Sequence, residues 1–321
     1  MSINISFIIP HKGREEFLIR TIESICSQDY DADKFEILVI TQNKVLTGLS
    51  HFDQSKFSIK VHYQPKDITI SALRNFGATE AKGEYFAFLD ADIQLSKNWI
   101  ESMLSTLNEK PQRLLVSAAQ INGQNAPPLE RIRTALSNAE LDCEVNFLPG
   151  RNLFLTRETF DKVGGFPEHL ITCEDYYFTD QINQLGNLYY TSKATYVHLG
   201  EDKKYKEMYK KEIWRGQSNL QSIKGRNIPL REIPSFIVPL GIAVLFIIFI
   251  STLFMEMYSA SSLSLGLLSV PIIAYTLRLH KLTKDDVSIW HVFQFYLMYF
   301  PARAIGTLGG LFKSFSNSGI K

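Results

Sequence analysis

The sequence predicts an α/β domain with a mostly parallel sheet flanked by helices, followed by a C-terminal α-helical membrane region. In the first two thirds of the chain, short apolar runs typical of buried strands alternate with segments of helical periodicity. The composition then changes, because residues 234–277 carry a single formal charge, at Glu256. A chain of 321 residues exceeds one average domain. We therefore expect an α/β domain over 1–225 and membrane-associated helices over 226–321.

The expected elements of the first region follow one another as strand, helix and strand. Residues 5–10 are nearly all apolar, as in a central parallel strand, and 15–27 repeat apolar residues at helical spacing. Parallel strands joined by right-handed crossovers account for this order. The expected strands are 5–10, 35–40, 58–63, 84–89, 114–120 and 153–156, with a last strand pair at 189–197. The expected helices are 15–27, 70–81, 99–109, 157–163 and 174–185, with a short amphipathic piece within 122–138.

Overall charge and cysteine content exclude some classes of function. The net charge of +1 gives no sign of a nucleic-acid partner. The three cysteines are far apart and lack the C-x-x-C spacing of a zinc site, so we expect reduced thiols. The first ten residues have no basic segment and no long apolar core, so they predict a first strand and not a secretory signal.

Two aspartates end the apolar strand at 84–89. Alternation along the strand places Asp90 and Asp92 on one side and Ala91 on the other. Two carboxylates so close repel each other, and Mg²⁺ or Mn²⁺ would offset that repulsion. A solvated acidic strand end is the alternative, because Asp-x-Asp is a short pattern. Ligands of parallel sheets lie beyond the carboxyl ends of the strands, where residues 10–14 and 41–43 would join the aspartates.

A second acidic pair, Glu174 and Asp175, opens the helix expected at 174–185. The helix dipole favours acidic residues in a first turn, so simple N-terminal capping is one interpretation of this pair.

Six short motifs, in this order and spacing, resemble those of glycosyltransferase family 2, over roughly residues 3–200. They are Ile8-Ile9-Pro10, Arg74-Asn75-x-Gly77, Gly83-Glu84-Tyr85, Asp90-Ala91-Asp92, Gly164-Gly165-Phe166 and Glu174-Asp175. The resemblance implies the GT-A fold, a single nucleotide-binding α/β domain. It also implies transfer of a sugar from a nucleotide-sugar donor with inversion at the anomeric carbon.

The resemblance also implies roles for individual residues. Asp92 corresponds to the metal ligand, and Asp90 to a residue that faces the ribose or sugar of the donor and can reach the metal through water. Asp175 corresponds to the general base and Glu174 to a residue that orients it or the acceptor. His198 corresponds to a further metal or phosphate contact, with a structural role as the alternative. The expected donor-binding residues are Pro10, Lys12, Arg14, Thr41, Gln42, Arg74, Asn75, Asp90 and Ala91. The expected acceptor-side residues are Gly150, Arg151 and Asn152.

This assignment is chemically coherent. Inversion is a single in-line displacement, so a base must stand on the acceptor side and take the hydroxyl proton. A metal on the other side would offset the charge of the leaving diphosphate.

The sequence departs from the family pattern in two places. Thr41 and Gln42 stand where relatives usually have acidic residues that contact the base, although a hydroxyl and an amide can still hydrogen-bond a base edge. A similarity of 10–16 and 41–43 to galactosyltransferases that use UDP-sugars favours UDP. The Gln-x-x-Arg-Trp signature of processive synthases is absent, with Trp214-Arg215 a poor match. We therefore expect transfer of one sugar per encounter.

The C-terminal third predicts membrane association. Uncharged runs at about 235–255 and 258–277 approach the roughly 20 residues that a bilayer requires. Basic flanks, including the amphipathic segment 201–231, predict a hairpin with the catalytic domain on the cytoplasmic face of the inner membrane. A third apolar segment, 287–312, contains Arg303, so a helix in the interface or a re-entrant helix is favoured over a third span. A buried soluble helix pair is the alternative for the hairpin.

These features predict a membrane-anchored hexosyltransferase. It would move a sugar from a nucleotide-sugar, with UDP favoured, to a lipid-linked glycan or glycolipid acceptor in cell-surface polysaccharide biosynthesis. One alternative is a polyprenyl-phosphate sugar synthase, whose acceptor is already ionised. Others are a catalytically silent nucleotide-sugar-binding scaffold and, with little support from so few helices, a transporter.

Overall fold

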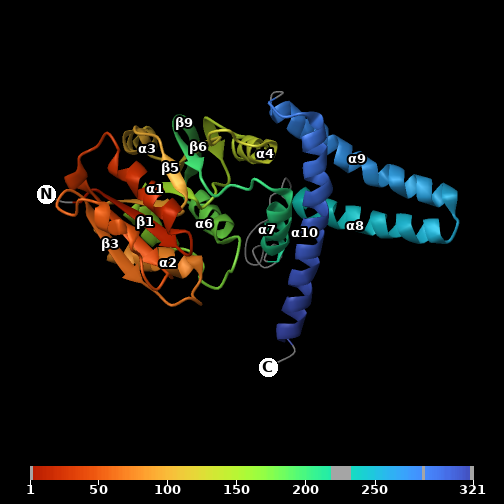
Figure 1. The fold of residues 1–321 in the computed structure, drawn as a ribbon, viewed down its shortest axis with the longest axis horizontal. Helices are drawn as coiled ribbons and strands as arrows, with labels where there is room; N and C mark the ends of the chain where they lie inside the picture. Colours follow the sequence, from red (N-terminus) through yellow and green to blue (C-terminus); the bar gives the residue numbers. More distant parts are fainter. Residues whose placement is uncertain (1–2, 218–232, 284–285, 319–321) are drawn as a thin grey trace. The chain divides into compact units, whose positions relative to one another are not determined.

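The computed structural model describes residues 3–217, 233–283 and 286–318, with side chains as far as residue 310 (Figure 1). The chain separates into two compact units. Unit 1 comprises Met1–Gly123 and Glu140–Gly200, and unit 2 comprises Gln124–Ala139 and Glu201–Lys321. The domain boundary expected between residues 225 and 226 lies outside the described residues.

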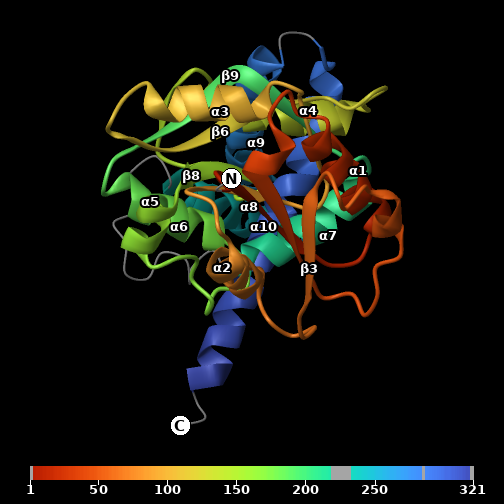
Figure 2. The same ribbon diagram turned by 90° about the vertical axis from the view of Figure 1, so that its left-hand side faces the viewer.

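Unit 1 is built on one sheet with the strand order β3-β2-β1-β4-β8-β6-β9-β5, and β7 pairs with β9. Figure 2 labels β3, β8, β6 and β9 of this sheet. The strands β3, β2, β1 and β4 are parallel neighbours. Beyond them β8 runs antiparallel to both β4 and β6, so the sheet is mixed. The predicted α/β class is confirmed. The strands are β1 Ile5–His11, β2 Phe35–Thr41, β3 Ser58–Tyr63, β4 Tyr85–Leu89, β5 Ile93–Leu95, β6 Arg113–Ile121, β7 Cys143–Val145, β8 Asn152–Thr156 and β9 Asn187–His198.

Helices cover both faces of this sheet. On one face α1 and α3 bury Leu18, Ile22, Trp99 and Met103 against the strands. On the other face α2, α5 and α6 contribute Leu73, Phe160 and Phe178 to a second core. The helices are α1 Glu15–Cys26, α2 Ile70–Glu80, α3 Trp99–Asn108, α5 Arg157–Val163 and α6 Glu174–Asn183. Strands buried on both sides are continuous apolar runs, which explains the near absence of alternation in β1, β2 and β4.

The structure corrects the sequence-based expectation in three elements. The strands β5 and β7 were not expected, because three residues are too few to show a period. The strand pair expected at 189–197 was wrong, since β9 is one strand. Its pairing with β6 jumps from Thr191 to Thr195 between Ala118 and Ala119, and this irregularity lies in the middle of the segment that was expected to hold two strands.

Unit 2 consists of helices and includes α4, which comes from the middle of the chain. Its helices are α4 Pro128–Ser137, α7 Tyr205–Gly216, α8 Ile233–Phe254, α9 Tyr258–Leu282 and α10 Ile289–Ser318. Leu129 and Ile132 of α4 share a core with residues of α7, α8, α9 and α10. Among the described residues, α8 and α9 are long and apolar enough to cross a membrane. They lie side by side as a hairpin, and α10 runs across its base (Figure 1).

Candidate active site

Four segments meet at one edge of the sheet in unit 1. The parallel strands β1, β2 and β4 all end there, as expected for neighbours in register. The start of β8 joins them, because antiparallel pairing sets Asn152 opposite Leu89. The backbone N–H of Asp90 therefore donates to the carbonyl oxygen of Arg151 at 3.1 Å. Both carboxylate pairs expected from the sequence are held around this edge.

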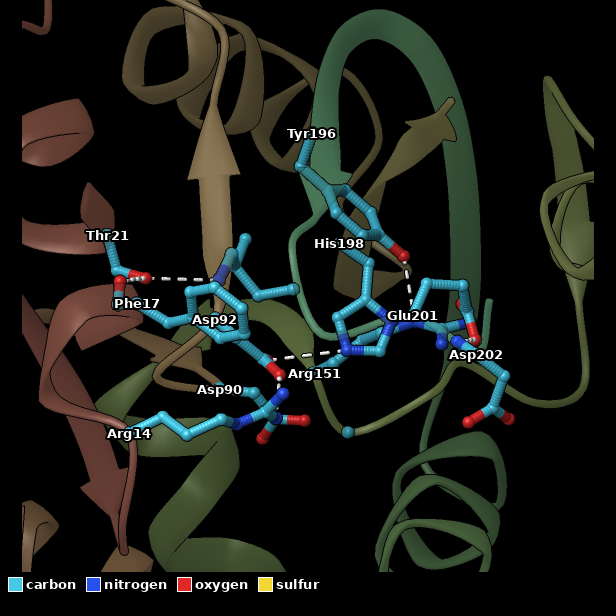
Figure 3. A network of polar contacts seen from close by, with 12 residues as sticks. Arg14, Phe17, Thr21, Asp90, Asp92, Arg151, Tyr196, His198, Glu201 and Asp202 are labelled. Carbon is cyan, nitrogen blue, oxygen red and sulfur yellow. Dashed lines mark hydrogen bonds and ion pairs between the residues drawn. The ribbon is translucent and has the colours of Figure 1, made fainter. Parts of the chain in front are cut away.

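Asp92 lies between two basic side chains (Figure 3). Its Oδ2 is 3.3 Å from Nη2 of Arg14, and its Oδ1 is 3.3 Å from Nε2 of His198 at the end of β9. The Arg14 guanidinium also lies over the ring of Phe17, at 4.5 Å. The Asp92 carbonyl accepts from the N–H of Leu199 at 2.8 Å, so the backbones of both loops are joined as well.

A glycine permits this close approach. A Cβ on Gly200 would collide with the Asp92 carboxylate and would lie 2.8 Å from Nη2 of Arg14. A side chain on the residue after Leu199 would therefore displace the Asp92 carboxylate and the Arg14 guanidinium from their present contact.

Arg74 of α2 connects the two carboxylate pairs. Its Nη2 donates to Oδ1 of Asp90 at 3.0 Å and to the Gly150 carbonyl at 3.2 Å, and its Nη1 donates to Oε1 of Glu174 at 2.9 Å. The side chain is only 2% exposed, and its guanidinium lies 4.9 Å from the ring centroid of Phe166. Asp90 and Glu174, which are far apart in sequence, thus share one guanidinium.

Burial shapes the acid–base properties of this cluster. Burial raises the pKa of Asp90, against the lowering effect of Arg74. Burial and the neighbouring carboxylate of Asp175 raise the pKa of Glu174 in the same way. Burial lowers the pKa of the Arg74 guanidinium, but the three carboxylates outweigh it and the pKa is raised overall. Arg74 therefore stays charged and holds Asp90 and Glu174 in place.

Asp175 is fixed by two backbone amides. Its Oδ2 accepts from the N–H of Gly150 at 3.1 Å and its Oδ1 from the N–H of Tyr176 at 2.9 Å. A Cβ on Gly150 would lie 3.0 Å from Cβ of Asp175 and 3.1 Å from Nη2 of Arg74. Since the Gly150 carbonyl also accepts from Arg74, the backbone of Gly150 links the guanidinium to the carboxylate of Asp175.

Asn75 holds a turn against α2. Its Oδ1 accepts from the N–H of Phe166 at 2.8 Å, and its Nδ2 donates to the Phe166 carbonyl at 2.9 Å and to Glu168. The turn needs glycine, because Gly164 and Gly165 have φ of +77° and +81°. The turn sets Phe166 against Phe88 and Phe178, which connects β4 to α6 beneath the site.

An open pocket of about 400 Å³ lies at the ends of β1 and β2, lined by Lys12, Gly13, Gln42, Asn43, Lys44, Val45 and Lys66. Nε2 of Gln42 donates to the carbonyls of Pro65 and Ile68, at 2.8 and 3.0 Å. The amide orientation leaves the Gln42 side-chain oxygen as the group that can face a ligand. Next to it, Thr41 lies 2.9 Å from Nδ1 of His11 through its hydroxyl.

The remaining candidates occupy the same edge. Pro10 lies within β1 opposite Ile40, and Ala91 is partly exposed between the two aspartates. Arg151 donates from Nε to the Tyr196 hydroxyl at 2.9 Å (Figure 3). Asn152 is fully buried in β8, and neither atom of its amide has a hydrogen-bond partner among the described residues.

The residues around Asp92 fit a divalent cation. The carboxylate oxygen of Asp92 and the imidazole nitrogen of His198 are 3.3 Å apart, so both can reach one ion. Both groups are ligands of divalent transition-metal ions. Asp90 already gives one oxygen to Arg74. Among the described residues, no group of three or more His, Cys, Asp or Glu side chains forms a complete metal site. Water and donor phosphates usually complete a Mg²⁺ shell of this kind.

Sequence reasoning missed the bridging position of Arg74 and the requirement at Gly200. Arg74 was expected to bind the donor, and nothing in its local pattern shows a partner a hundred residues away. Gly200 did carry a signal, because it follows His198 closely at the end of an expected strand.

Comparison with known families and proteins gives consistent matches. The model of the family "Glycosyl transferase family 2" matches residues 6–166. The glycosyltransferase AglE of Haloferax volcanii is 26% identical over 236 residues, which cover 71% of this chain and 77% of AglE. The poly(ribitol-phosphate) β-N-acetylglucosaminyltransferase TarS of Staphylococcus aureus is 23% identical over 60% of this chain but only 36% of its own length.

Solved structures show the same fold. A mannosyltransferase from Pyrobaculum calidifontis, in complex with GDP-Man and Mn²⁺, superimposes with a TM-score of 0.63 at 16% identity, over 98% of this chain and 88% of that one. A fragment of S. aureus TarS in complex with UDP superimposes with a TM-score of 0.50 at 16% identity, over 98% and 92% of the two chains. At these identities the likeness concerns the fold alone.

Proposed function

Because this chain belongs to glycosyl transferase family 2 and is a glycosyltransferase with the GT-A fold, we propose that it is an inverting, metal-dependent, membrane-anchored enzyme. Its donor is a UDP-sugar and its acceptor a lipid-linked glycan or glycolipid. The sugar is a hexose, and the product belongs to cell-surface polysaccharide.

One observation carries the proposal. Arg74 binds Asp90 of the donor-side pair and Glu174 of the acceptor-side pair through a single buried guanidinium. The capping interpretation of Glu174 and Asp175 does not require such a connection. A donor and an acceptor bound at this edge would therefore lie between the two pairs.

Asp175 is suited to act as the general base. Two backbone N–H groups fix its carboxylate, so it is oriented before the acceptor arrives. The acceptor hydroxyl oxygen forms a bond to the anomeric carbon while the bond from that carbon to the β-phosphate oxygen breaks. The hydroxyl proton goes to Asp175, and the nucleoside diphosphate leaves with the electron pair. The configuration inverts because attack and departure occur on opposite faces.

Asp92 and His198 are the residues that would hold a divalent cation. When bound there, the cation would supply positive charge to the diphosphate. The Arg14 guanidinium lies on the other oxygen of Asp92 and supports the same charge.

The side chain of Gln42 favours a donor whose nucleobase has a ring N–H on its Watson–Crick edge. Since both N–H groups of its amide are occupied by backbone carbonyls, it offers an acceptor to the pocket. Uracil, thymine and guanine present an N–H on their Watson–Crick edge, whereas cytosine presents a bare ring nitrogen at that position. Uracil fits both this requirement and the similarity to enzymes that use UDP-sugars.

The helices α8 and α9 fit a membrane anchor, and an enzyme at the bilayer meets lipid-linked acceptors by lateral diffusion. Arg278 and Lys281 at the end of α9 support a cytoplasmic orientation. Relatives such as the amylovoran biosynthesis glycosyltransferase AmsB of Erwinia amylovora support a role in polysaccharide synthesis.

The decisive experiment measures Mn²⁺-dependent nucleotide release by the purified enzyme with a panel of UDP-, GDP-, dTDP- and CDP-sugars. We expect release with a UDP-sugar and none with a CDP-sugar. Asp92→Asn and Asp175→Asn should each abolish transfer, whereas the exposed Asp161→Asn in α5 should not. Full activity of Asp92→Asn would refute the metal assignment.

The same variants separate the main alternatives. A polyprenyl-phosphate acceptor is already ionised and needs no base, so undiminished activity of Asp175→Asn would point to a polyprenyl-phosphate sugar synthase. Tight UDP-sugar binding without any release would point to a silent scaffold.

A further inference from the structure

The exposed face of α10 is apolar along most of its described length. Trp290, Leu297, Met298, Ile305 and Leu308 follow one another at helical spacing, each between 41% and 59% exposed. From Trp290 to Leu308 this stripe extends over about 27 Å at 1.5 Å per residue. Gln294 is a polar residue on this face, but a soluble protein seldom leaves a mainly apolar stripe of this length uncovered.

The opposite face of α10 packs on α7. Near its beginning, the Tyr205 hydroxyl of α7 donates to the His291 carbonyl at 3.0 Å. Near its described end, Gly216 and Gly306 bring the two backbones together, since a Cβ on either would lie 2.9 Å from the Cα of the other. Gly310 lies against the backbone of Gln217. Thus α10 follows α7 from one end of α7 to the other.

A buried ionic cluster fixes this contact. Nε of Arg303 in α10 lies 2.8 Å from the carboxylate of Glu212 in α7. The same carboxylate accepts a hydrogen bond from Nη1 of Arg133 in α4 at 3.0 Å. Arg303 is therefore directed at α7 and not at the apolar stripe. An arginine in lipid is energetically costly, which is why a membrane span was not favoured from the sequence. That cost does not arise here, because the face of α10 that carries Arg303 is turned away from lipid.

The charged residues of α7 limit how deeply α10 can lie in a membrane. Lys206, Glu207 and Lys210 are exposed on α7, and such residues remain in water. Because α10 contacts α7 at both ends, α10 stays at the level of the water boundary along this whole stretch. Only the stripe on its far side can enter an apolar phase.

We propose that α10 lies in the plane of the membrane, with the stripe from Trp290 to Leu308 embedded at the edge of the hydrocarbon core. This inference rests on the proposed membrane anchor. The hairpin of α8 and α9 supports it, because α10 runs across the base of that hairpin and shares its core through Val292, Phe295 and Phe300 (Figure 1). A helix crossing the base of a spanning hairpin lies along the bilayer surface. Tryptophan at one end of the stripe is typical of an interface.

The bilayer suits this face better than a second copy of the chain. The hairpin also exposes apolar side chains, since Val244, Phe246 and Ile247 of α8 are more than half exposed. One apolar phase covers both surfaces, whereas a dimer through α10 would leave the hairpin uncovered.

The test measures the depth of single labelled cysteines in proteoliposomes. Leu297→Cys, Ile305→Cys and Leu308→Cys carry a nitrobenzoxadiazole label, in a background with Cys143→Ser and Cys173→Ser. Cys26 can stay, because burial raises its pKa to about 12 and suppresses thiolate labelling. The quenchers are phosphatidylcholines brominated at carbons 6 and 7 or at carbons 11 and 12. Ile247→Cys in α8 serves as the deep control and Lys210→Cys in α7 as the aqueous control.

We expect shallow bromines to quench all three α10 labels more than deep bromines do, with the same ratio at each position. Ile247→Cys should show the reverse preference, and Lys210→Cys should respond only to aqueous iodide. A third span would move the label by about 16 Å between residues 297 and 308, so a ratio that changes steadily along α10 overturns the proposal. Unquenched α10 labels beside a quenched Ile247→Cys also overturn it and indicate a covering protein copy.

The outcome stays separate from the catalytic proposal. An unquenched Ile247→Cys would remove the membrane anchor and this inference together, while nucleotide release by the same preparation would still test the glycosyltransferase chemistry.

Discussion

Arg74 contacts one carboxylate on each side of the candidate site, and its side chain is almost completely buried. Three acceptors surround it, at Asp90, Glu174 and the Gly150 carbonyl. A planar guanidinium can satisfy acceptors in several directions at once, whereas an ammonium acts as a point charge. The position therefore requires the shape of arginine as well as its charge.

We expect Arg74→Lys to lower kcat by about 100-fold, because the two carboxylates lose their fixed separation. Steady-state nucleotide release checks this, with KM for the donor measured in parallel. Arg157→Lys is the matched control, since Arg157 bonds the carbonyls of Ala81 and Gly83 away from the carboxylates. An unchanged kcat in Arg74→Lys would exclude a positioning role.

Some of these residues could be found from the sequence and others could not. Asp90 and Asp92 follow a clearly patterned strand, and Glu174 and Asp175 begin a helix with a recognisable acidic first turn. The bridging contacts of Arg74 depend on Gly150 and Glu174, 76 and 100 positions away, and no local pattern encodes a partner at that distance.

At the scale of elements, α7 and α10 depend on glycine for their contact. A side chain at Gly306 would collide with the backbone of α7. Gly309 lies three residues further along the same helix, and a Cβ there would meet nothing within 4 Å. Substitutions at these two glycines therefore distinguish the effect of helix packing on stability from the effect of helix propensity.

We expect Gly306→Leu to lower the melting temperature of the detergent-solubilised protein, because the helices must move apart and lose the contact between Arg303 and Glu212. Gly309→Leu should leave the melting temperature unchanged or raise it slightly, since it improves helix propensity. Similar losses in both variants would show that the contact contributes little.

Glu212 makes the same contact dependent on pH. Burial alone would raise its pKa, but Arg133, Arg303 and Arg215 lower it from 4.5 to about 2. A carboxylate whose pKa is lowered by folding stabilises the folded state at any pH above its pKa in the unfolded chain. This contribution is lost as the pH falls from 4.5 towards 2. This lowering of the pKa corresponds to a contribution of about 3 kcal/mol to the free energy of unfolding.

The expected result is that melting temperature drops steeply between pH 4.5 and 2 in the wild type. Glu212→Gln should melt lower at neutral pH and show less of this drop. Thermal unfolding followed by intrinsic fluorescence over that range checks both statements, and parallel curves for the two proteins would contradict them.

The larger helices and strands were predictable because each repeats its pattern over many residues. Three-residue strands such as β5 and β7 have no pattern to detect, and the irregular pairing of β9 looked like two strands. The amphipathic piece that became α4 was expected, but no pattern in the sequence indicated that it belongs with the C-terminal helices.

At the scale of the whole molecule, the two units do not correspond to two consecutive stretches of chain. Leu129 and Ile132 of α4 are buried in the core of unit 2, although residues of unit 1 precede and follow α4. A protein cut after Gly200 would keep α4 but lose the helices that cover its apolar face.

We expect the fragment 1–200 to aggregate, and the same fragment with Leu129→Ser and Ile132→Ser to be monomeric, because the exposed apolar side chains are then removed. Size-exclusion chromatography with light scattering distinguishes the two. A monomeric fragment without the serines would show that α4 does not need the C-terminal helices.

The shared core of α4 and the C-terminal helices also bears on inheritance. A genetic exchange with one crossover near codon 200 would join a foreign C-terminal third to a resident α4 and mismatch the residues around Leu129 and Ile132. Viable hybrids between relatives should therefore need two further crossovers, one on each side of codons 124–139. For the same reason, grafting this anchor onto another enzyme requires transplanting two separate gene segments.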